Sequence, residues 1–279
     1  MKRKIIIFIV LVGLVWAFLH INNNWLQTTE YIIESERIPS SFDGMKIVQL
    51  SDLHDATFGD KQIKLVDKVK NLNPDFIFIT GDLIDSNRYK LQNSLDLVEQ
   101  LTDFAEVFYV TGNHEVAVNE VDEITGALES LGVFVLKNEA VTIEQNGEIL
   151  LIAGIEDPLM KVTDETEVAV ANSIDIAMEG MPKNAFTLLL SHRPEVFDVY
   201  VEKEMDVTFS GHAHGGQVRI PGLGGVIAPG QGWFPTYTSG KHEQGNTTMF
   251  VSRGLGNSII PFRILNRPEI IAVTLKSMK

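Results

Sequence analysis

The sequence contains no cysteine among its 279 residues. A disulfide framework and a thiolate metal site are therefore both excluded. Any metal ion would have to be bound by His, Asp, Glu or Asn side chains, a ligand set that suits Mn, Fe, Zn or Mg. The seven histidines are consequently the first residues to place.

Positive charge is also scarce, since 23 Lys and Arg residues face 37 Asp and Glu residues and give a net charge of −14. Non-specific nucleic-acid binding depends on neutralising phosphates with basic side chains, so this composition argues against a nucleic-acid partner. It does not exclude a phosphate-bearing substrate, because bound metal ions supply local positive charge. No internal repeat stands out, and the length suits one large domain or two small ones.

The first 25 residues have the composition of a membrane anchor. Lys2, Arg3 and Lys4 precede residues 5–21, which contain no Asp, Glu, Lys or Arg. As a helix this run would reach roughly 26 Å, close to the bilayer core of about 30 Å. A cleaved signal peptide is the alternative, but the run ends in bulky residues and lacks an Ala-x-Ala-like site. We favour an uncleaved single-pass anchor in the cell membrane, with the rest of the chain on the extracytoplasmic side.

Three parts are expected along the chain: an anchor (1–25), a linker with an edge strand (26–43) and one domain (44–279). Strands are expected at residues 31–33, 45–50, 75–80, 107–110, 186–190, 205–209, 247–251 and 269–275, and helices at 61–72, 91–104, 121–131 and 164–178. Residues 141–152 predict a hairpin around Asn146-Gly147, a type I′ turn signal. The early strand–helix alternation predicts an α/β architecture with parallel strands, in which ligands bind beyond the carboxyl ends of the strands.

Five of the apolar runs end at polar residues that can bind metal. These endings hold five of the seven histidines together with acidic and amide side chains: Asp52, His54, Asp82, Asn113, His114, His192, His212 and His214. The set is too large for one tetrahedral ion and about right for two ions that share a carboxylate. Two ions about 3.5–4 Å apart would clamp the attacking and leaving oxygens of a phosphoryl displacement and lower the pKa of a bridging water.

The order and spacing of these residues resemble the signature of calcineurin-like metallophosphoesterases. The matching motifs are Asp52-x-His54, Gly81-Asp82-x-x-Asp85, Gly112-Asn113-His114-Glu115, an isolated His192, and Gly211-His212-x-His214. The resemblance implies an α/β fold, a sandwich of two mixed β-sheets flanked by helices. It also implies hydrolysis of a phosphodiester or pyrophosphate bond by attack of a metal-bridging hydroxide.

The same resemblance implies roles for the individual residues. One metal ion would be bound by Asp52, His54 and His214, the other by Asn113, His192 and His212, and both by Asp82. His114 would protonate the leaving oxygen or stabilise charge in the transition state, and Asp85 would orient it. The two divalent ions are expected to be Mn²⁺, with Fe and Zn as alternatives.

The anchor, residues 215–217 and the tail at 251–270 resemble one membrane-associated bacterial branch of this family. That branch includes phosphodiesterases of the UDP-2,3-diacylglucosamine hydrolase type, so a lipid-linked phosphoester is among the candidate substrates. One position departs from the protein-phosphatase branch: Ser86 stands where that branch has an Arg that grips phosphate. Arg88 and Arg253 are the candidates to replace it, and the glycine-rich setting of Arg253 favours the latter.

Residues 221–245 are rich in Gly and Pro, with Trp233, Phe234 and Tyr237 interleaved. They predict either a mobile flap over the substrate cleft or an ordered surface loop whose aromatic side chains pack inward. The alternative to catalysis is a non-catalytic, metal-stabilised surface protein that binds phosphate polymers. The intact His114–Asp85 pair argues against that alternative, because binding alone needs no proton donor. The sequence makes no prediction of oligomeric state.

Overall fold

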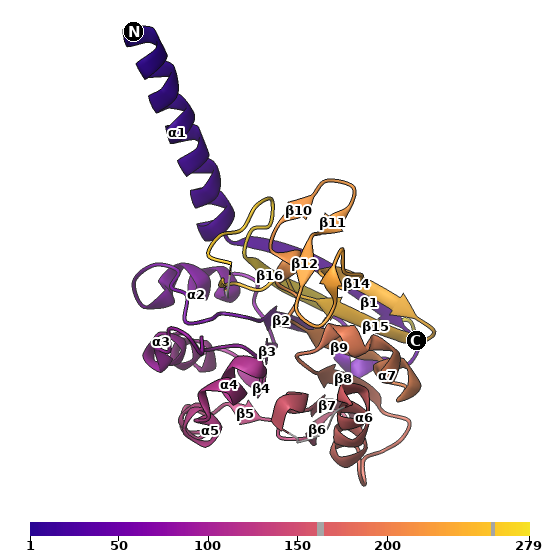
Figure 1. The fold of residues 1–279 in the computed structure, drawn as a ribbon. Coiled ribbons are helices and arrows are strands. Elements are labelled where there is room, and N and C mark those ends of the chain that lie inside the picture. The colour runs from indigo at the N-terminus through magenta and orange to yellow at the C-terminus, as the bar shows by residue number, and fades with distance from the viewer. Residues whose placement is uncertain (161–164, 258–259) are drawn as a thin grey trace.

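The computed structural model describes residues 1–160, 165–257 and 260–279. Two six-stranded mixed sheets pack face to face, and helices cover both outer faces (Figure 1). The strand orders are β1-β16-β2-β3-β4-β5 in the first sheet and β14-β15-β9-β8-β7-β6 in the second. This is the predicted sandwich of two mixed sheets flanked by helices, so the predicted fold class is confirmed.

The elements have the following bounds. The first sheet consists of β1 (Gln27–Ser35), β16 (Glu269–Ser277), β2 (Lys46–Leu50), β3 (Phe76–Thr80), β4 (Glu106–Val110) and β5 (Phe134–Val135). The second consists of β14 (Gly240–Gln244), β15 (Thr247–Val251), β9 (Val207–Ser210), β8 (Phe186–Leu190), β7 (Glu148–Gly154) and β6 (Glu139–Gln145). Two small sheets pair β10 (Arg219–Ile220) with β11 (Gly224–Gly225), and β12 (Ile227–Ala228) with β13 (Gly232–Trp233).

The α-helices are α1 (Lys2–Asn24), α2 (Ile63–Lys70), α3 (Leu91–Thr102), α4 (Asn113–Val118), α5 (Val121–Ser130), α6 (Thr166–Ala177) and α7 (Phe197–Glu202). Short 3₁₀ helices occur at Ser40–Phe42, Asp60–Gln62, Pro158–Met160, Pro194–Val196 and His214–Gly216. The four predicted helices correspond to α2, α3, α5 and α6, within a few residues at each end. Residue 164, the predicted start of the last of these, lies outside the described residues. Helices α4 and α7 were not predicted.

Aromatic and branched apolar side chains fill the space between the sheets. Phe78 and Phe108 of the first sheet and Phe209 and Phe250 of the second are fully buried. Phe78 and Phe209 meet edge to face across the interface, with ring centroids 5.1 Å apart. Burying one such side chain contributes roughly 1.5–3 kcal/mol to stability. The outer face of the first sheet packs against α2, α3 and α5, and that of the second against α6 and α7.

Two local features decide how the strands are connected. Strands β6 and β7 turn at Asn146-Gly147, and both residues have positive φ (53° and 79°), as a type I′ turn requires. The last strand, β16, inserts between the first two, parallel to β1 and antiparallel to β2. The predicted edge strand at 31–33 therefore lies within the longer β1, which is paired along its whole length with the C-terminal strand.

Helix α1 projects away from the sandwich (Figure 1). It has 23 residues and is long and apolar enough to cross a membrane, although a signal sequence would meet the same criterion. Its apolar side chains from Ile5 to Trp16 are exposed, whereas Asn22, near its end, is buried. The C-terminal end of α1 thus packs against the sandwich, whereas the preceding turns of the helix are exposed.

Candidate metal centre

Buried His and Asp side chains gather where β2, β3, β8 and β9 end. Their potential ligand atoms form two groups, each with all atoms within 4.8 Å of one another: Asp52, His54, Asp82 and His214 in the first, and Asp82, His192 and His212 in the second. None of these residues is more than 4 % exposed. Asp82 belongs to both groups, so the geometry offers two binding positions that share one carboxylate.

The backbone of these loops is held in an unusual conformation. Positive φ values between 48° and 64° occur at Asp52, His54, Asp82, His212 and His214. A residue with a Cβ rarely adopts such values, and they persist mainly at functional sites where the surroundings enforce them. The loops enforce them on each other here, because Asp52 N donates to Gly81 O (3.0 Å) and His54 N donates to Asp82 O (3.1 Å).

Two motif glycines allow the loops to approach this closely. A Cβ on Gly112 would lie 2.3 Å from Asp82 Oδ1, and a Cβ on Gly211 would lie 2.5 Å from Asp52 Oδ2. Real Cβ atoms do not come so near, so any larger residue would displace a candidate ligand. These glycines are required by the cluster itself.

The first ligand group carries its histidines in the form that binds metal. His54 Nε2 faces His214 Nε2 at 3.1 Å, and His214 Nε2 lies 3.4 Å from Asp52 Oδ1. Burial lowers the pKa of His54 and of His214 to about 3 each, so both rings are neutral at pH 7. Divalent cations are bound by neutral imidazole nitrogens and by ionised carboxylates, so this set of donors suits a divalent cation.

The second group is electrostatically different. Burial opposes the charge on His192, but Asp82 outweighs it and raises the pKa of His192 to about 10, with His192 Nε2 3.2 Å from Asp82 Oδ2. Burial also opposes ionisation of Asp82, yet His192 and His54 hold the pKa of Asp82 well below its usual range. An ion binding here must displace a proton from His192.

Asn113, the first residue of α4, stands beside this group. Its Oδ1 is buried without a hydrogen-bond partner among the described residues. Such an oxygen is costly to bury unless a ligand satisfies it. His114 N donates to Asp82 Oδ1 (2.8 Å), which fixes the start of α4 against the shared carboxylate. An amide oxygen there also fits a divalent cation.

His114 is placed close to the first group, but its Nδ1 partner differs from the predicted one. Its ring meets that of His54 at a centroid distance of 4.4 Å. Asp85 Oδ1 lies 3.9 Å from His114 Nδ1, beyond hydrogen-bond range, whereas Ser86 N donates to that nitrogen at 3.0 Å. Since Nδ1 accepts this bond, the neutral ring carries its proton on Nε2. Asp85 instead binds Arg88 and Asn87 N.

Sequence reasoning missed the role of Glu115. Its buried carboxylate accepts four backbone N–H groups, from Asp82 (3.0 Å), Leu83 (2.8 Å), Ile84 (3.1 Å) and Gly112 (2.7 Å). It thereby joins the loops after β3 and β4. The available signal was a Glu at the third position of a helix after a Gly N-cap, which is capping-box spacing.

Two pockets adjoin the cluster. The first, of about 290 Å³, is lined by His54, Asp55, Arg88, Lys90 and Asn257 among others. Both arginine candidates are ion-paired, Arg88 with Asp85 and Arg253 with Glu269 (2.8 Å). Of the two, Arg88 lines this pocket.

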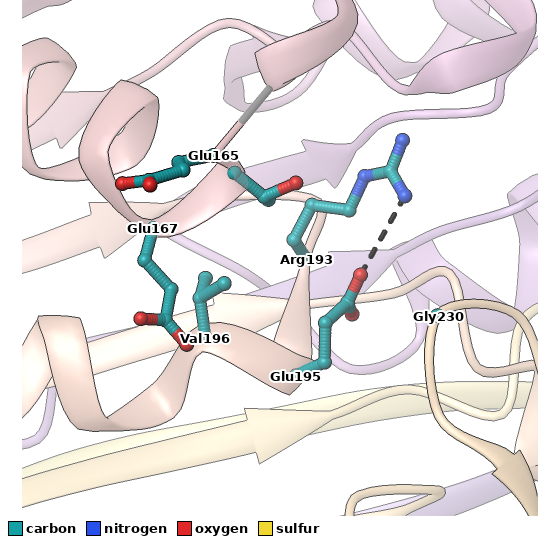
Figure 2. Close-up of a pocket in the computed structure, with 7 residues that line it drawn as sticks. Glu165, Glu167, Arg193, Glu195, Val196 and Gly230 are labelled. Carbon is teal, nitrogen blue, oxygen red and sulfur yellow. Dashed lines mark ion pairs between the residues drawn. The ribbon is translucent and has the colours of Figure 1, made fainter. Parts of the chain in front are cut away.

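The second pocket, of about 430 Å³, contains Arg193, another residue that sequence reasoning missed. Its Nε and Nη2 donate to the two carboxylate oxygens of Asp157 (2.6 and 3.0 Å), and its Nη1 lies 3.0 Å from His212 Nε2. Figure 2 shows Arg193 and Glu195 directed toward each other, with Glu165 and Glu167 along the opposite side of the pocket.

Residues 221–245, predicted as a flap or as an ordered loop, direct their aromatic side chains in two ways. Tyr237 packs inward, edge to face with Phe197 at a centroid distance of 5.6 Å. Trp233 and Phe234 point outward and are 71 % and 63 % exposed. The small strands β11, β12 and β13 give the segment a defined backbone.

Comparison with known proteins agrees with the geometry. The family described as calcineurin-like phosphoesterase matches residues 45–216, more than half of the chain. The chain is 32 % identical over 264 residues to an uncharacterized metallophosphoesterase, YkuE, of Bacillus subtilis, covering 92 % of this chain and 88 % of that protein. It therefore belongs to the calcineurin-like phosphoesterase family.

Two further comparisons, one with a sequence and one with a solved structure, gave partial matches. A transmembrane protein with metallophosphoesterase domain from Bos taurus is 30 % identical over 252 residues, which cover 86 % of this chain and 55 % of that protein. The crystal structure of a phosphopantetheinyl hydrolase from Mycobacterium tuberculosis aligns with a TM-score of 0.47 at 12 % identity, covering 77 % of this chain and 91 % of that one.

Proposed function

We propose that this protein is a dinuclear metal-dependent hydrolase of phosphodiester or pyrophosphate bonds. The observation that carries the proposal is the pair of buried ligand groups that share Asp82. Asp52, His54 and His214 would hold one ion, His192, His212 and Asn113 the other, and Asp82 both. When bound, two divalent ions lower the pKa of a water molecule and withdraw charge from a phosphoryl oxygen. Mn²⁺ is the favoured ion, with Fe and Zn as alternatives, because all three accept mixed imidazole and carboxylate ligands.

The side chains around the cluster would complete the reaction. His114, with its proton on Nε2, is placed to donate a hydrogen bond to the leaving oxygen and to stabilise the negative charge that develops there, and Ser86 N fixes the ring in this tautomer. Arg88, held by Asp85, is placed to bind a phosphoryl oxygen from the neighbouring pocket. Asp85 would then act on the substrate through Arg88.

The N-terminal part supports a proposal about location. We propose that residues 1–25 anchor the protein in a membrane, that 26–43 link the anchor to the sheet through the edge strand, and that 44–279 form the catalytic domain. The exposed apolar surface of α1 favours lipid as its surroundings. Three basic residues at its start favour an extracytoplasmic catalytic domain. A lipid-linked phosphoester is accordingly a candidate substrate.

The test uses the full-length chain in detergent, because Asn22 and Asn23 of α1 bond to the sandwich. It should hydrolyse bis-p-nitrophenyl phosphate when Mn²⁺ is supplied and lose this activity with EDTA. Asp82→Ala should abolish turnover, whereas Asp103→Ala, at an exposed acid between α3 and the start of β4, should not change it. If Asp82→Ala stays folded and retains the wild-type rate, the proposal is wrong. A metal-loaded protein that is inert yet retains phosphate polymers would indicate the binding function instead.

A further inference from the structure

The end of α1 is hydrogen-bonded to the segment that precedes β16. Asn23 Oδ1 accepts Arg263 N at 2.9 Å, and Asn22 Oδ1 accepts Asn266 N at 3.3 Å. Arg263 and Asn266 are themselves fully buried. These contacts join residues that are 240 and 244 positions apart, and they hold the last turn of α1 against the sandwich. The direction of the helix is therefore set by the folded domain.

Exposed apolar side chains gather beside this helix end, and we call the following set the collar: Trp25, Ile220, Leu223, Phe262 and Leu265. They are 59 %, 39 %, 70 %, 41 % and 48 % exposed, in that order. The two segments that carry most of them are joined, since Arg219 N donates to Ile264 O at 3.0 Å. Figure 1 shows the β10–β11 hairpin on the same side of the molecule as α1.

Positive charge accompanies the collar. A pocket of about 310 Å³ lies between the last turn of α1 and Lys64 and Lys68 of α2, and none of its described lining residues is acidic. Arg267 lies over the ring of Trp25, 6.0 Å from its centroid. In a chain with a net charge of −14, this grouping of basic and aromatic side chains matches the chemistry of a phospholipid headgroup layer.

We propose that the collar rests in the headgroup layer of the bilayer that α1 crosses, with Lys64 and Lys68 facing lipid phosphates. This inference rests on the proposed membrane anchor. A helix of 23 residues is about 35 Å long, and the hydrocarbon core is about 30 Å thick, so the end of α1 marks the bilayer surface. The collar lies beside that end, since Trp25 follows it directly and Phe262 and Leu265 flank the residues that bond to Asn22 and Asn23. Exposed apolar side chains grouped in this way mark a contact surface, and the bilayer is the surface already adjacent to them.

The position of the collar has a consequence for the substrate. Asn257 Nδ2 donates to Asn23 Oδ1 at 3.0 Å, and the same Asn257 lines the pocket that contains His54. Arg88 Nη2 donates to Asn257 O at 2.7 Å. The basic pocket of the metal centre thus borders the segment that meets the membrane. A phosphoester whose apolar part remains in the bilayer can place its phosphate in this pocket.

The absence of cysteine makes a direct test practical, because single introduced cysteines can be labelled selectively in the full-length chain. We would reconstitute each variant in vesicles of phosphatidylcholine and phosphatidylglycerol that contain nitroxide-bearing lipids. A fluorophore at Leu223→Cys or Phe262→Cys should be quenched several-fold more than one at Ile176→Cys, an exposed position on α6 (55 %) away from the collar. A fluorophore at Val12→Cys, within α1, shows whether the helix itself lies in the bilayer.

The outcomes separate the inference from the anchor on which it rests. If Val12→Cys is quenched but the collar labels behave like Ile176→Cys, the collar does not contact lipid and the inference is wrong. If Val12→Cys is also unquenched, the anchor fails and the inference fails with it. Collar labels shielded from aqueous iodide but unquenched by lipid would indicate a protein partner and would overturn the proposal. Leu265→Cys replaces either collar variant that does not fold.

Discussion

The two pockets beside the metal cluster differ in charge. The pocket at His54 presents Lys90 and Arg88, the latter paired with Asp85, and its acidic residue, Asp55, is engaged by Asp85 N, Lys90 N and Ser94 Oγ. A phosphoester carries negative charge, so this side of the cluster attracts it.

The pocket beside His212 has the opposite character. Glu165, Glu167 and Glu195 line it, and the guanidinium of Arg193 is already neutralised by Asp157. Burial raises the pKa of Glu195, against the effect of Arg193, but the exposed glutamates remain as negative charge. Under the proposed function, the exposed glutamates of this pocket lead us to expect that an anionic substrate binds from the His54 side, which is also the side where α1 ends.

The largest expected effect is at His114, the hydrogen-bond donor on the basic side. His114→Ala should lower kcat by about 10²–10³-fold, the usual range for loss of a donor that stabilises developing negative charge. Metal content should stay at the wild-type level, because His114 is not among the grouped ligand atoms. A histidine on β14 far from the cluster, His242→Ala, is the matched control. Unchanged kcat in His114→Ala would remove this residue from the mechanism.

The two ligand groups should respond differently to pH. His192 holds a proton below about pH 10, so an ion in its group must displace that proton, whereas His54 and His214 are neutral above about pH 3. Affinity for one of two Mn²⁺ ions should therefore rise about tenfold per unit between pH 6 and 9, and affinity for the other should change little. Calorimetric titration across this range measures both. If the affinities for the two ions changed equally with pH, the difference in protonation assigned to the two ligand groups would be wrong.

Arg88 provides the next test of the comparison. Arg88→Ala should reduce kcat/KM by about 10–100-fold, since hydrogen bonds to charged groups contribute about 1.5–3 kcal/mol and each 1.36 kcal/mol is tenfold. Arg37→Ala removes a comparably exposed, ion-paired arginine elsewhere (49 % against 57 % of the side chain) and should have no effect on rate. Equal losses in both variants would show that a general change of charge is responsible.

The smallest effect is expected in the acidic pocket. Glu167→Gln should alter kcat/KM by less than about twofold, because a single exposed charge contributes only about 0–1 kcal/mol. If Glu167→Gln lowered kcat/KM as much as Arg88→Ala does, the substrate would bind in the acidic pocket, which is the reverse of what the comparison of the two pockets predicts. Steady-state kinetics at fixed ionic strength measure both variants under the same screening.

The sequence predicted the centre of the fold better than its edges. The apolar runs that became β2, β3, β4, β8 and β9 were recognised because each is a short run of β-prone residues followed by polar ones. The insertion of β16 between β1 and β2 could not be foreseen, since pairing between residues 27 and 269 has no local signal. Helices α4 and α7, with six residues each, are too short to show a helical period.

For the candidate site, the sequence predicted residue types but not their partners. Every predicted Asp and His ligand lies in one of the two groups, and Asn113 lies beside them. The contact of Ser86 N with His114 was not predictable, because a backbone donor is available at any residue type. Arg193 was missed for a related reason: its importance comes from Asp157 and His212, which only the folded chain brings to it.

The central claim is that Asp82 joins two metal ions, and Mn²⁺ electron paramagnetic resonance tests it most directly. The desalted full-length protein loaded with Mn²⁺ should contain two ions per chain and give the spectrum of an exchange-coupled pair. That coupling should vanish in Asp82→Ala. A wild-type protein with one ion per chain, or with two ions that show no coupling, would contradict the account.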